Sequence, residues 1–230
     1  MRSIDLNVDV GEGFPNDGEL IPLASSANIA CGGHAGDAAT MCAAIEIAIK
    51  AGTHIGAHPG YEDRENFGRV VVDLPARVIA RQVVEQIDRL AATAESMSTA
   101  VRHVKLHGAL YHEANQNAWL AEAIMSAIAE RLPGCRLIAP PEGCQKTAAI
   151  AHGLIPIAEG FADRGYASGG NLLPRDAPGA RIDEPSAAVR QAIELAGSVE
   201  SICIHGDSRH AARILTAVRQ ALEAKGYGIG

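Results

Sequence analysis

The 230-residue sequence has few aromatic residues, no excess of positive charge, no paired cysteines and no long apolar segment. Its 20 Lys and Arg residues are outnumbered by 27 Asp and Glu, which gives a formal net charge of −7. Proteins that bind nucleic acid need a basic surface for the phosphate backbone. The charge balance, with no basic run to offset it, therefore argues against a nucleic-acid partner.

The five cysteines are odd in number, are scattered, and include no C-x-x-C pair. This usage is typical of a reduced protein rather than a secreted one held by disulfides. No apolar run approaches the ~18 residues that a membrane span needs. The first residues alternate in polarity and do not form a basic segment followed by an apolar one, so no signal peptide is indicated. We therefore expect a cytoplasmic protein that does not enter a membrane.

The sequence does contain a regular alternation of strand-like and helix-like segments. Strands are predicted at 3–13, 25–34, 53–58, 101–107, 136–140, 155–160 and 201–207. Helices are predicted at 37–50, 75–94, 116–132, 143–152, 185–197 and 208–222, with Asp37 and Ser208 as N-caps of the first and last. Seven strands that alternate with six helices predict one α/β domain over residues 1–230, with a parallel sheet covered by helices.

Two architectures fit this alternation: a closed (β/α) barrel and an open, doubly wound sheet. The dinucleotide fingerprint G-x-G-x-x-G is absent after the first strand, which weakens the open-sheet interpretation. Both architectures place the active site at the carboxyl ends of the strands. Ionisable residues gather there, namely Asp9, Glu12, His34, His58, Lys105, His107, Glu159, His205 and Asp207.

The first strand has an unusual alternation. Asp5, Asn7 and Asp9 fall on one face, and apolar residues fall on the other, because successive side chains of a strand point to opposite faces. If the sheet closes, the polar face points into the barrel, toward His58, His107 and His205. Buried carboxylates are costly without partners, so we expect these three polar residues to be paired.

Several of these residues also have a plain structural explanation. Glu12 could be an ordinary loop residue, and His103 could be a satisfied core residue. Cys31 and His34 have C-x-x-H spacing, but no second Cys/His pair completes a tetrahedral set, so a structural zinc site is not predicted and no metal ligand is assigned.

A long segment, 160–184, is rich in Gly, Pro and Arg and has no predicted helix or strand. Loops of this length are usually functional or disordered. Its arginines, Arg164 and Arg175, together with Arg64 and Arg69 from an earlier loop, could grip a carboxylate or phosphate. A solvated loop is the alternative.

Long blocks of the sequence resemble the LamB/YcsF family, the A subunit of prokaryotic 5-oxoprolinase. They are DLNVDVGEGF, ANIACGGHAGD, IGAHPGYEDRENFGR, VKLHGALYH, FADRGY, LLPR and IHGD, in this order across nearly the whole chain. The resemblance implies a seven-stranded (β/α) TIM-like barrel of the glycoside hydrolase and deacetylase type. The chain departs from the family pattern at Leu106, His112 and Gly169, and its segment before Ser201 is shorter.

The resemblance also implies a reaction, ATP-dependent opening of the 5-oxoproline lactam to glutamate, with separately encoded subunits B and C as partners. Such a reaction needs a base for water, donors for the developing charge and a proton for the leaving nitrogen. We expect Asp9 or Asp5 as the base and His58 and His107 as acid or oxyanion donors. Lys105 would bind phosphate or the oxyanion, and Asn7 completes the predicted catalytic set. The predicted substrate-binding residues are Glu12, His34, Arg64, Arg69, Arg164, Arg175, His205 and Asp207, and ATP would arrive with Mg²⁺.

Two other functions stay open at this point. A metal-dependent deacetylase or amidohydrolase would use Asp9, His58 and His107 to hold a metal that activates water. A non-catalytic scaffold would only dock subunits B and C, but a docking surface needs no histidines inside a barrel mouth. The sequence also leaves open a homo-oligomer.

Overall fold

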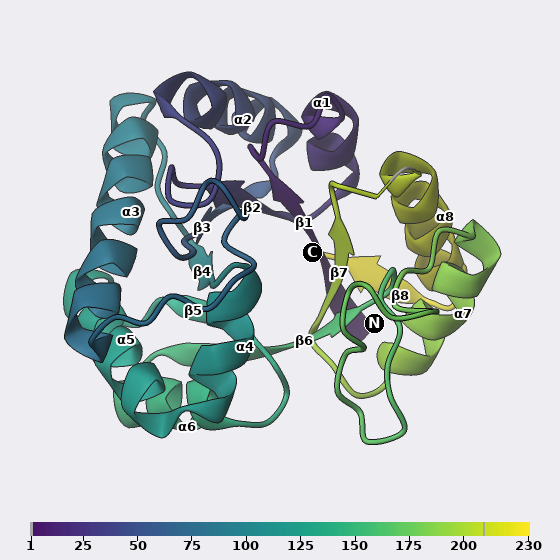
Figure 1. Ribbon diagram of the computed structural model, residues 1–230. Coiled ribbons are helices and arrows are strands. Elements are labelled where there is room, and N and C mark those ends of the chain that lie inside the picture. Colours follow the sequence, from purple (N-terminus) through teal and green to yellow (C-terminus); the bar gives the residue numbers. More distant parts are fainter. Residues whose placement is uncertain (1, 209) are drawn as a thin grey trace.

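In a computed structural model the chain forms a closed barrel of seven parallel strands with helices around the outside (Figure 1). The structure describes residues 2–208 and 210–230. The barrel strands are β1 (Arg2–Val10), β2 (Ser26–Ala30), β3 (His54–His58), β4 (His103–Lys105), β5 (Arg136–Ala139), β6 (Ile155–Phe161) and β7 (Ser201–His205). They pair in chain order, and β1 pairs with both β2 and β7. That double pairing closes the sheet, so the predicted barrel is confirmed and the open sheet is excluded.

The helices cover the barrel, and a short helix, α1, and a 3₁₀ turn lie in the connection from β1 to β2. Their bounds are α1 (Asp17–Leu20), a 3₁₀ turn (Ile21–Leu23), α2 (Ala38–Ala51), α3 (Ala76–Ser96), α4 (Gly108–Gln116), α5 (Ala118–Arg131), α6 (Cys144–Ala151), α7 (Pro185–Leu195) and α8 (Ala211–Ala224). A short strand, β8 (Tyr227–Ile229), pairs with the start of β1 and lies outside the barrel. None of the described helices is long and apolar enough to cross a membrane.

Two predicted helix starts have opposite outcomes. Asp37 caps α2 as predicted: its carboxylate accepts from the Thr40 amide, and the Thr40 hydroxyl accepts from the Asp37 amide. The prediction for Ser208 is wrong, because α8 begins only after His210 and no side chain caps it. The Ser208 amide instead donates to the carbonyl of His205, in a turn that closes β7.

The helix predicted at 116–132 is α5, and a helix that the sequence did not predict, α4, directly precedes it. Asn117 between them has an extended backbone, and its side chain caps α5 by accepting from the Leu120 amide. An Asn cap of this kind ends one helix and begins the next, whereas apolar spacing alone shows no break there. α4 begins directly after His107, two residues beyond the end of β4 and beside the barrel mouth.

The apolar core lies between the barrel and the helices. Ile4, Leu6 and Val8 of β1 are buried on the outward face of the strand. Each such side chain contributes ~1.5–3 kcal/mol when fully buried. The opposite face of β1 is left for polar groups inside the barrel, which is where the chemistry of the molecule gathers.

Candidate active site

Polar side chains fill the barrel interior and meet around one buried lysine. Lys105 Nζ, from the end of β4, lies 2.8 Å from Glu159 Oε1 and 3.0 Å from Asp9 Oδ1. Its other neighbours are Asn7 Oδ1 at 3.1 Å and Cys203 Sγ at 3.0 Å. All five of these residues are buried. The barrel interior is therefore a compact ionic network with one cation between two carboxylates.

The two carboxylates of this network differ in their ionisation. Burial opposes ionisation of Asp9, but His58, Lys105 and His205 outweigh it and hold the Asp9 pKa well below its usual range. Burial raises the pKa of Glu159, and Lys105 only partly offsets that effect. Glu159 also accepts a hydrogen bond from the Tyr111 hydroxyl at 2.9 Å. Asp9 is thus the anionic partner of Lys105, and Glu159 is the carboxyl group that holds a proton more readily.

A chain of amides fixes the orientation of Asp9. His103 Nε2 lies 2.8 Å from Asn28 Oδ1, so the Asn28 amide nitrogen is free to donate to Asp9 Oδ1 at 2.8 Å. The same nitrogen donates to Asn7 Oδ1 at 2.7 Å. Oδ1 of Asp9 is therefore occupied by Asn28 and Lys105, whereas Oδ2 accepts no hydrogen bond from the described residues. His103 is the satisfied buried histidine that the sequence allowed for.

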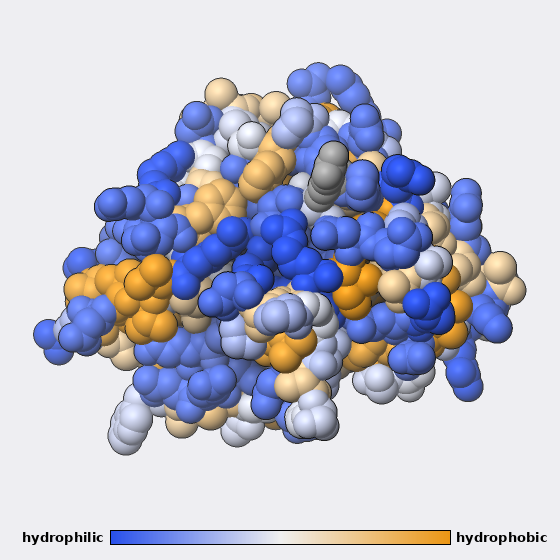
Figure 2. All heavy atoms as spheres, turned by 45° about the vertical axis from the view of Figure 1, so that its right-hand side comes forward, coloured by the Kyte–Doolittle hydropathy of each residue, from blue (hydrophilic) through white to orange (hydrophobic). Residues whose placement is uncertain are grey.

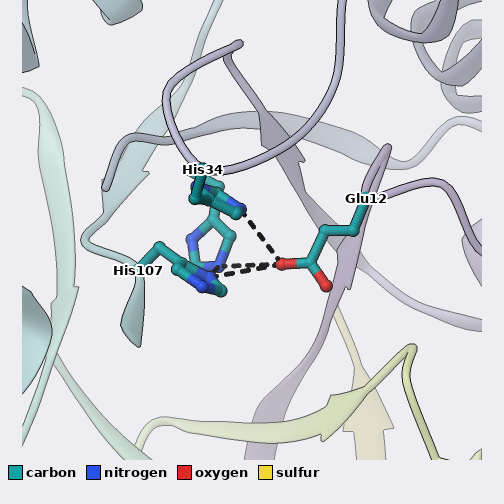
Figure 3. Close-up of side chains that lie close together, drawn as sticks. Glu12, His34 and His107 are labelled. Atoms are coloured by element: carbon teal, nitrogen blue, oxygen red, sulfur yellow. Dashed lines mark hydrogen bonds and ion pairs between the residues drawn. The ribbon is translucent and has the colours of Figure 1, made fainter. Parts of the chain in front are cut away.

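A second group, which we call the histidine cluster, consists of Glu12, His34, His58 and His107 (three of them are labelled in Figure 3). One carboxylate oxygen of Glu12 lies 3.2 Å from His34 Nε2 and 3.2 Å from His107 Nδ1. The rings of His34 and His107 are stacked with centroids 3.5 Å apart. The ligand-type atoms of the four residues lie within 4.8 Å of one another, close enough to hold a single metal ion.

No spacing in the sequence could reveal the histidine cluster, because each member comes from a different connection of the barrel. Glu12 follows β1, His34 follows β2 by four residues, His58 ends β3 and His107 follows β4. Glu12 is only 4% exposed at its side chain, so it is part of the site and not a plain loop residue.

His205 approaches Asp9 from the other side of the mouth. Its Nδ1 lies 3.0 Å from Asp163 Oδ1, and its Nε2 lies 4.0 Å from Asp9 Oδ2. The Asp163 carboxylate also accepts from the His205 amide at 2.9 Å. Asp163, two residues beyond β6, thus orients the His205 ring. Sequence reasoning missed Asp163, although its place in FADRGY just after a predicted strand was a usable signal.

A cavity of about 550 Å³ opens beside this network. Tyr111, Glu159 and Phe161 form its inner wall, and Arg69 and Arg175 lie on its rim. A smaller adjoining hollow reaches Asp9, His58, Lys105 and His205. Figure 2 shows the molecule turned by 45° from the view of Figure 1. Hydrophilic side chains dominate the centre of this face, and apolar patches lie on either side. The cavity has the size expected for a small-molecule site.

Asp207 joins the two arginines of the cavity rim. Its Oδ2 accepts from Arg69 Nη2 and from Arg175 Nη1, each at 2.7 Å. Burial raises the pKa of Asp207, but Arg175, His205 and Arg69 lower it by more, so the carboxylate stays ionised. The long loop after β6 and the loop after β3 are therefore both held to the end of β7.

Three predicted site residues either lie away from the barrel mouth or already use their polar groups in local hydrogen bonds. Asp5 lies near the amino end of the barrel, where Ser25, Ser26 and Ser201 donate to its carboxylate. Arg64 donates to the carbonyls of Gly32 and Gly36 and lines neither hollow.

Arg164 lines the cavity, but its guanidinium donates to the carbonyls of Ala180 and Leu173. It holds the long loop in shape and is not free to grip a ligand. The placements of Asp5, Arg64 and Arg164 thus correct the roles predicted from sequence, because local hydrogen bonds use their polar groups.

Comparison with known proteins matches the LamB/YcsF family over residues 4–230. The structure of a lactam utilization protein from Thermus thermophilus is similar, with 34% identity, coverage of 99% of this chain and 98% of that one, and a TM-score of 0.91. A family 4 carbohydrate esterase from Streptomyces lividans (14% identity, 100% and 92% coverage, TM-score 0.57) shares the fold. So does the peptidoglycan deacetylase PdaC from Bacillus subtilis (13% identity, 99% and 86% coverage, TM-score 0.53).

Proposed function

The chain belongs to the LamB/YcsF family, and from this membership and the geometry of the barrel mouth we propose that it hydrolyses a lactam C–N bond. The substrate that we propose is 5-oxo-L-proline, opened to L-glutamate with hydrolysis of ATP. The chain would act as the A subunit of an enzyme completed by subunits B and C. The likeness to a protein described as acting in lactam utilization supports this substrate class.

The observation that carries the proposal is the position of the ionised Asp9 in the small hollow that adjoins the arginine-rimmed cavity. 5-Oxoproline is a small ring with one carboxylate, and a cavity of about 550 Å³ accommodates it. Arg69 and Arg175 each use one guanidinium nitrogen on Asp207. Arginine binds carboxylates through paired N–H groups, so the other N–H groups of these two residues would attract the substrate carboxylate. The lactam carbonyl would then face Asp9 and Lys105.

In the proposed chemistry Asp9 acts on the attacking water and His205 acts on the leaving nitrogen. ATP phosphorylates the amide oxygen and leaves as ADP, and water then attacks the activated carbonyl carbon while Asp9 Oδ2 takes a proton from it. The C–N bond breaks as His205 gives a proton to the nitrogen, which leaves an acyl phosphate. A second water hydrolyses the acyl phosphate to the glutamate carboxylate and free phosphate. Asp163 holds the His205 ring for this transfer, and Lys105 keeps Asp9 anionic and stabilises the developing charge.

Reconstitution tests the proposal. The chain is combined with 5-oxoprolinase subunits B and C, and glutamate release from 5-oxo-L-proline is measured with and without ATP. We expect glutamate only when this chain, both partner subunits and ATP are present. Glutamate formation at the same rate without this chain, or none from the complete mixture, would overturn the proposal.

One observation favours a second candidate function. The histidine cluster has the donor types of a hydrolytic metal site, and the fold is shared with deacetylases. Such an enzyme would release acetate from an N-acetylated glucosamine oligomer without ATP. Acetate release by the chain alone, with no glutamate from the reconstituted mixture, would favour this function over the lactam.

A further inference from the structure

The histidine cluster brings four ligand-type atoms to one point. Beyond the two contacts of Glu12 Oε1 with His34 and His107, His58 Nε2 lies 3.8 Å from this oxygen. It also lies 3.0 Å from His107 Nδ1. The side chains of all four residues are 0–6% exposed, so solvent does not satisfy them.

The hydrogen-bond partners of two rings show which nitrogens carry lone pairs. His58 Nδ1 lies 2.8 Å from the carbonyl oxygen of Lys105, and His107 Nε2 lies 3.0 Å from that of Phe67. A carbonyl only accepts, so both of these nitrogens must bear hydrogen. In neutral rings the remaining nitrogens, His58 Nε2 and His107 Nδ1, therefore direct lone pairs at each other and toward the Glu12 carboxylate. His58 Nε2 also lies 3.5 Å from Asp9 Oδ2.

Buried acceptors that face one another are unfavourable unless a cation or a proton lies between them. A tetrahedral ion with bonds of ~2.0–2.1 Å places its ligands ~3.3 Å apart. The three contacts of Glu12 Oε1 and the contact between His58 and His107 run from 3.0 to 3.8 Å. We infer that Glu12, His34, His58 and His107 bind a divalent first-row transition metal ion of the zinc type.

The donor set defines the class of ion. Mg²⁺ and Ca²⁺ prefer oxygen ligands, whereas imidazole nitrogens suit zinc and its first-row neighbours. The Lys105 and Phe67 carbonyls supply the outer hydrogen bonds that orient metal-binding histidines. Phe67 itself has φ +56°, a left-handed conformation that is uncommon for a residue other than glycine and costs energy. This strained residue aims its carbonyl at His107.

A second set of metal-ligand types, Asp9, Cys203 and His205, is less suited to an ion. Lys105 Nζ already lies 3.0 Å from both Asp9 Oδ1 and Cys203 Sγ, so a cation occupies the position that an ion would need. The metal site therefore belongs to the histidine cluster. It goes beyond the proposed lactam reaction and does not depend on it, because it rests on these four side chains alone.

Metal binding by the full chain, without substrate or partner subunits, tests the inference. Protein stripped with a chelator is titrated with Zn²⁺ by calorimetry and with Co²⁺ by visible absorption, which reports the coordination of the ion. We expect one equivalent of each metal to bind. His34→Ala and Glu12→Gln should weaken binding by at least ~100-fold, since losing only an outer partner already costs 10–100-fold.

Two control variants complete the experiment. His54→Ala removes an exposed histidine on β3, and His205→Ala removes a member of the second set; both should bind one equivalent as the wild type does. Circular dichroism checks that each variant folds. If His34→Ala does not fold, the test rests on Glu12→Gln, which preserves the shape of the side chain. No stoichiometric uptake by the wild type, as expected if a proton on His107 fills the site, would overturn the inference. So would binding that survives Glu12→Gln and is lost in His205→Ala.

Discussion

At the scale of single residues, Lys105 determines how the barrel interior tolerates its charges. An isolated buried carboxylate is very costly, and a buried pair is compensated only when geometry and further hydrogen bonds are good. Burial lowers the pKa of Lys105, but Asp9, Cys203 and Glu159 raise it well above its ordinary value. The ammonium group is therefore charged, and it lies 3.0 Å from Asp9 Oδ1.

Replacing this lysine should be strongly destabilising. Lys105→Met leaves Asp9 buried without its counter-charge, and breaking a buried pair typically costs ~3–5 kcal/mol. Lys50→Met is the matched control, because Lys50 pairs with Glu46 on an exposed helix surface, where ion pairs contribute little to stability. Urea unfolding measures both free energies. Equal losses for the two variants would contradict a structural ion network around Lys105.

At the scale of elements, two loops shape the cavity and meet at Asp207. Residues 160–184 were expected either to grip a ligand through their arginines or to be a solvated loop, and the structure shows the segment anchored through Arg175 and shaped by Arg164. The loop that follows β3 is anchored by Arg69 to the same carboxylate. One aspartate thus controls how firmly both sides of the cavity rim are held.

The pairing of Asp207 with Arg69 and Arg175 should weaken as the pH falls. The folded pKa of Asp207 lies below the unfolded value of ~3.9, despite the opposing effect of burial. Its ionic contribution to stability is therefore complete above ~pH 4 and is lost as the pH falls through the folded pKa. Asp207→Asn should cost ~1 kcal/mol at pH 7, since both arginines are partly exposed. In urea unfolding at several pH values the difference between variant and wild type should shrink toward acid; a difference independent of pH would contradict the assignment.

The loop after β3 also packs against the histidine cluster through a glycine. Gly68 has φ +62°, and a Cβ there would lie 2.8 Å from Cβ of His34. Gly68→Ala should cost ~2–4 kcal/mol, combining a left-handed alanine with overpacking. Gly153→Ala shares the left-handed backbone, with φ +73°, but meets nothing within 4 Å, so only ~1 kcal/mol should be lost. Thermal or urea unfolding measures both losses of stability. Equal losses for Gly68→Ala and Gly153→Ala would show that contact with His34 adds nothing to the cost at Gly68.

At the scale of the whole molecule, much of the architecture was predictable from the sequence. The strand and helix alternation predicts a parallel sheet, and family resemblance implies its closure. The alternation of β1 places Asn7 and Asp9 inside the barrel. Most differences between the predicted and observed helices arise where the local sequence signal is weak. A single cap, Asn117, separates α4 from α5, and the turn at Ser208 delays the start of α8.

The candidate site was less predictable, because closure of the barrel assembles it from distant segments. H-x-x-x-H spacings occur at 54–58 and 103–107, but on strands they separate the two histidines along the barrel. Residues such as Glu12 and His34 meet only after β1 pairs with β2. Asn28, which orients Asp9, has no spacing motif that identifies it, and Asp163 is indicated only by its place just after a predicted strand.

The two aspartates of β1 provide the most direct test that the reaction takes place at the mouth. Asp9 lies at the carboxyl end of the strand beside the cavity, and Asp5 lies four residues away among three serines. In the reconstituted enzyme, Asp9→Asn should lower ATP-dependent glutamate formation by ~10²–10⁴-fold, the usual contribution of a general base. Asp5→Asn, in folded protein, should retain most of the rate. Undiminished turnover in Asp9→Asn would contradict the account and would favour a scaffold role for this chain.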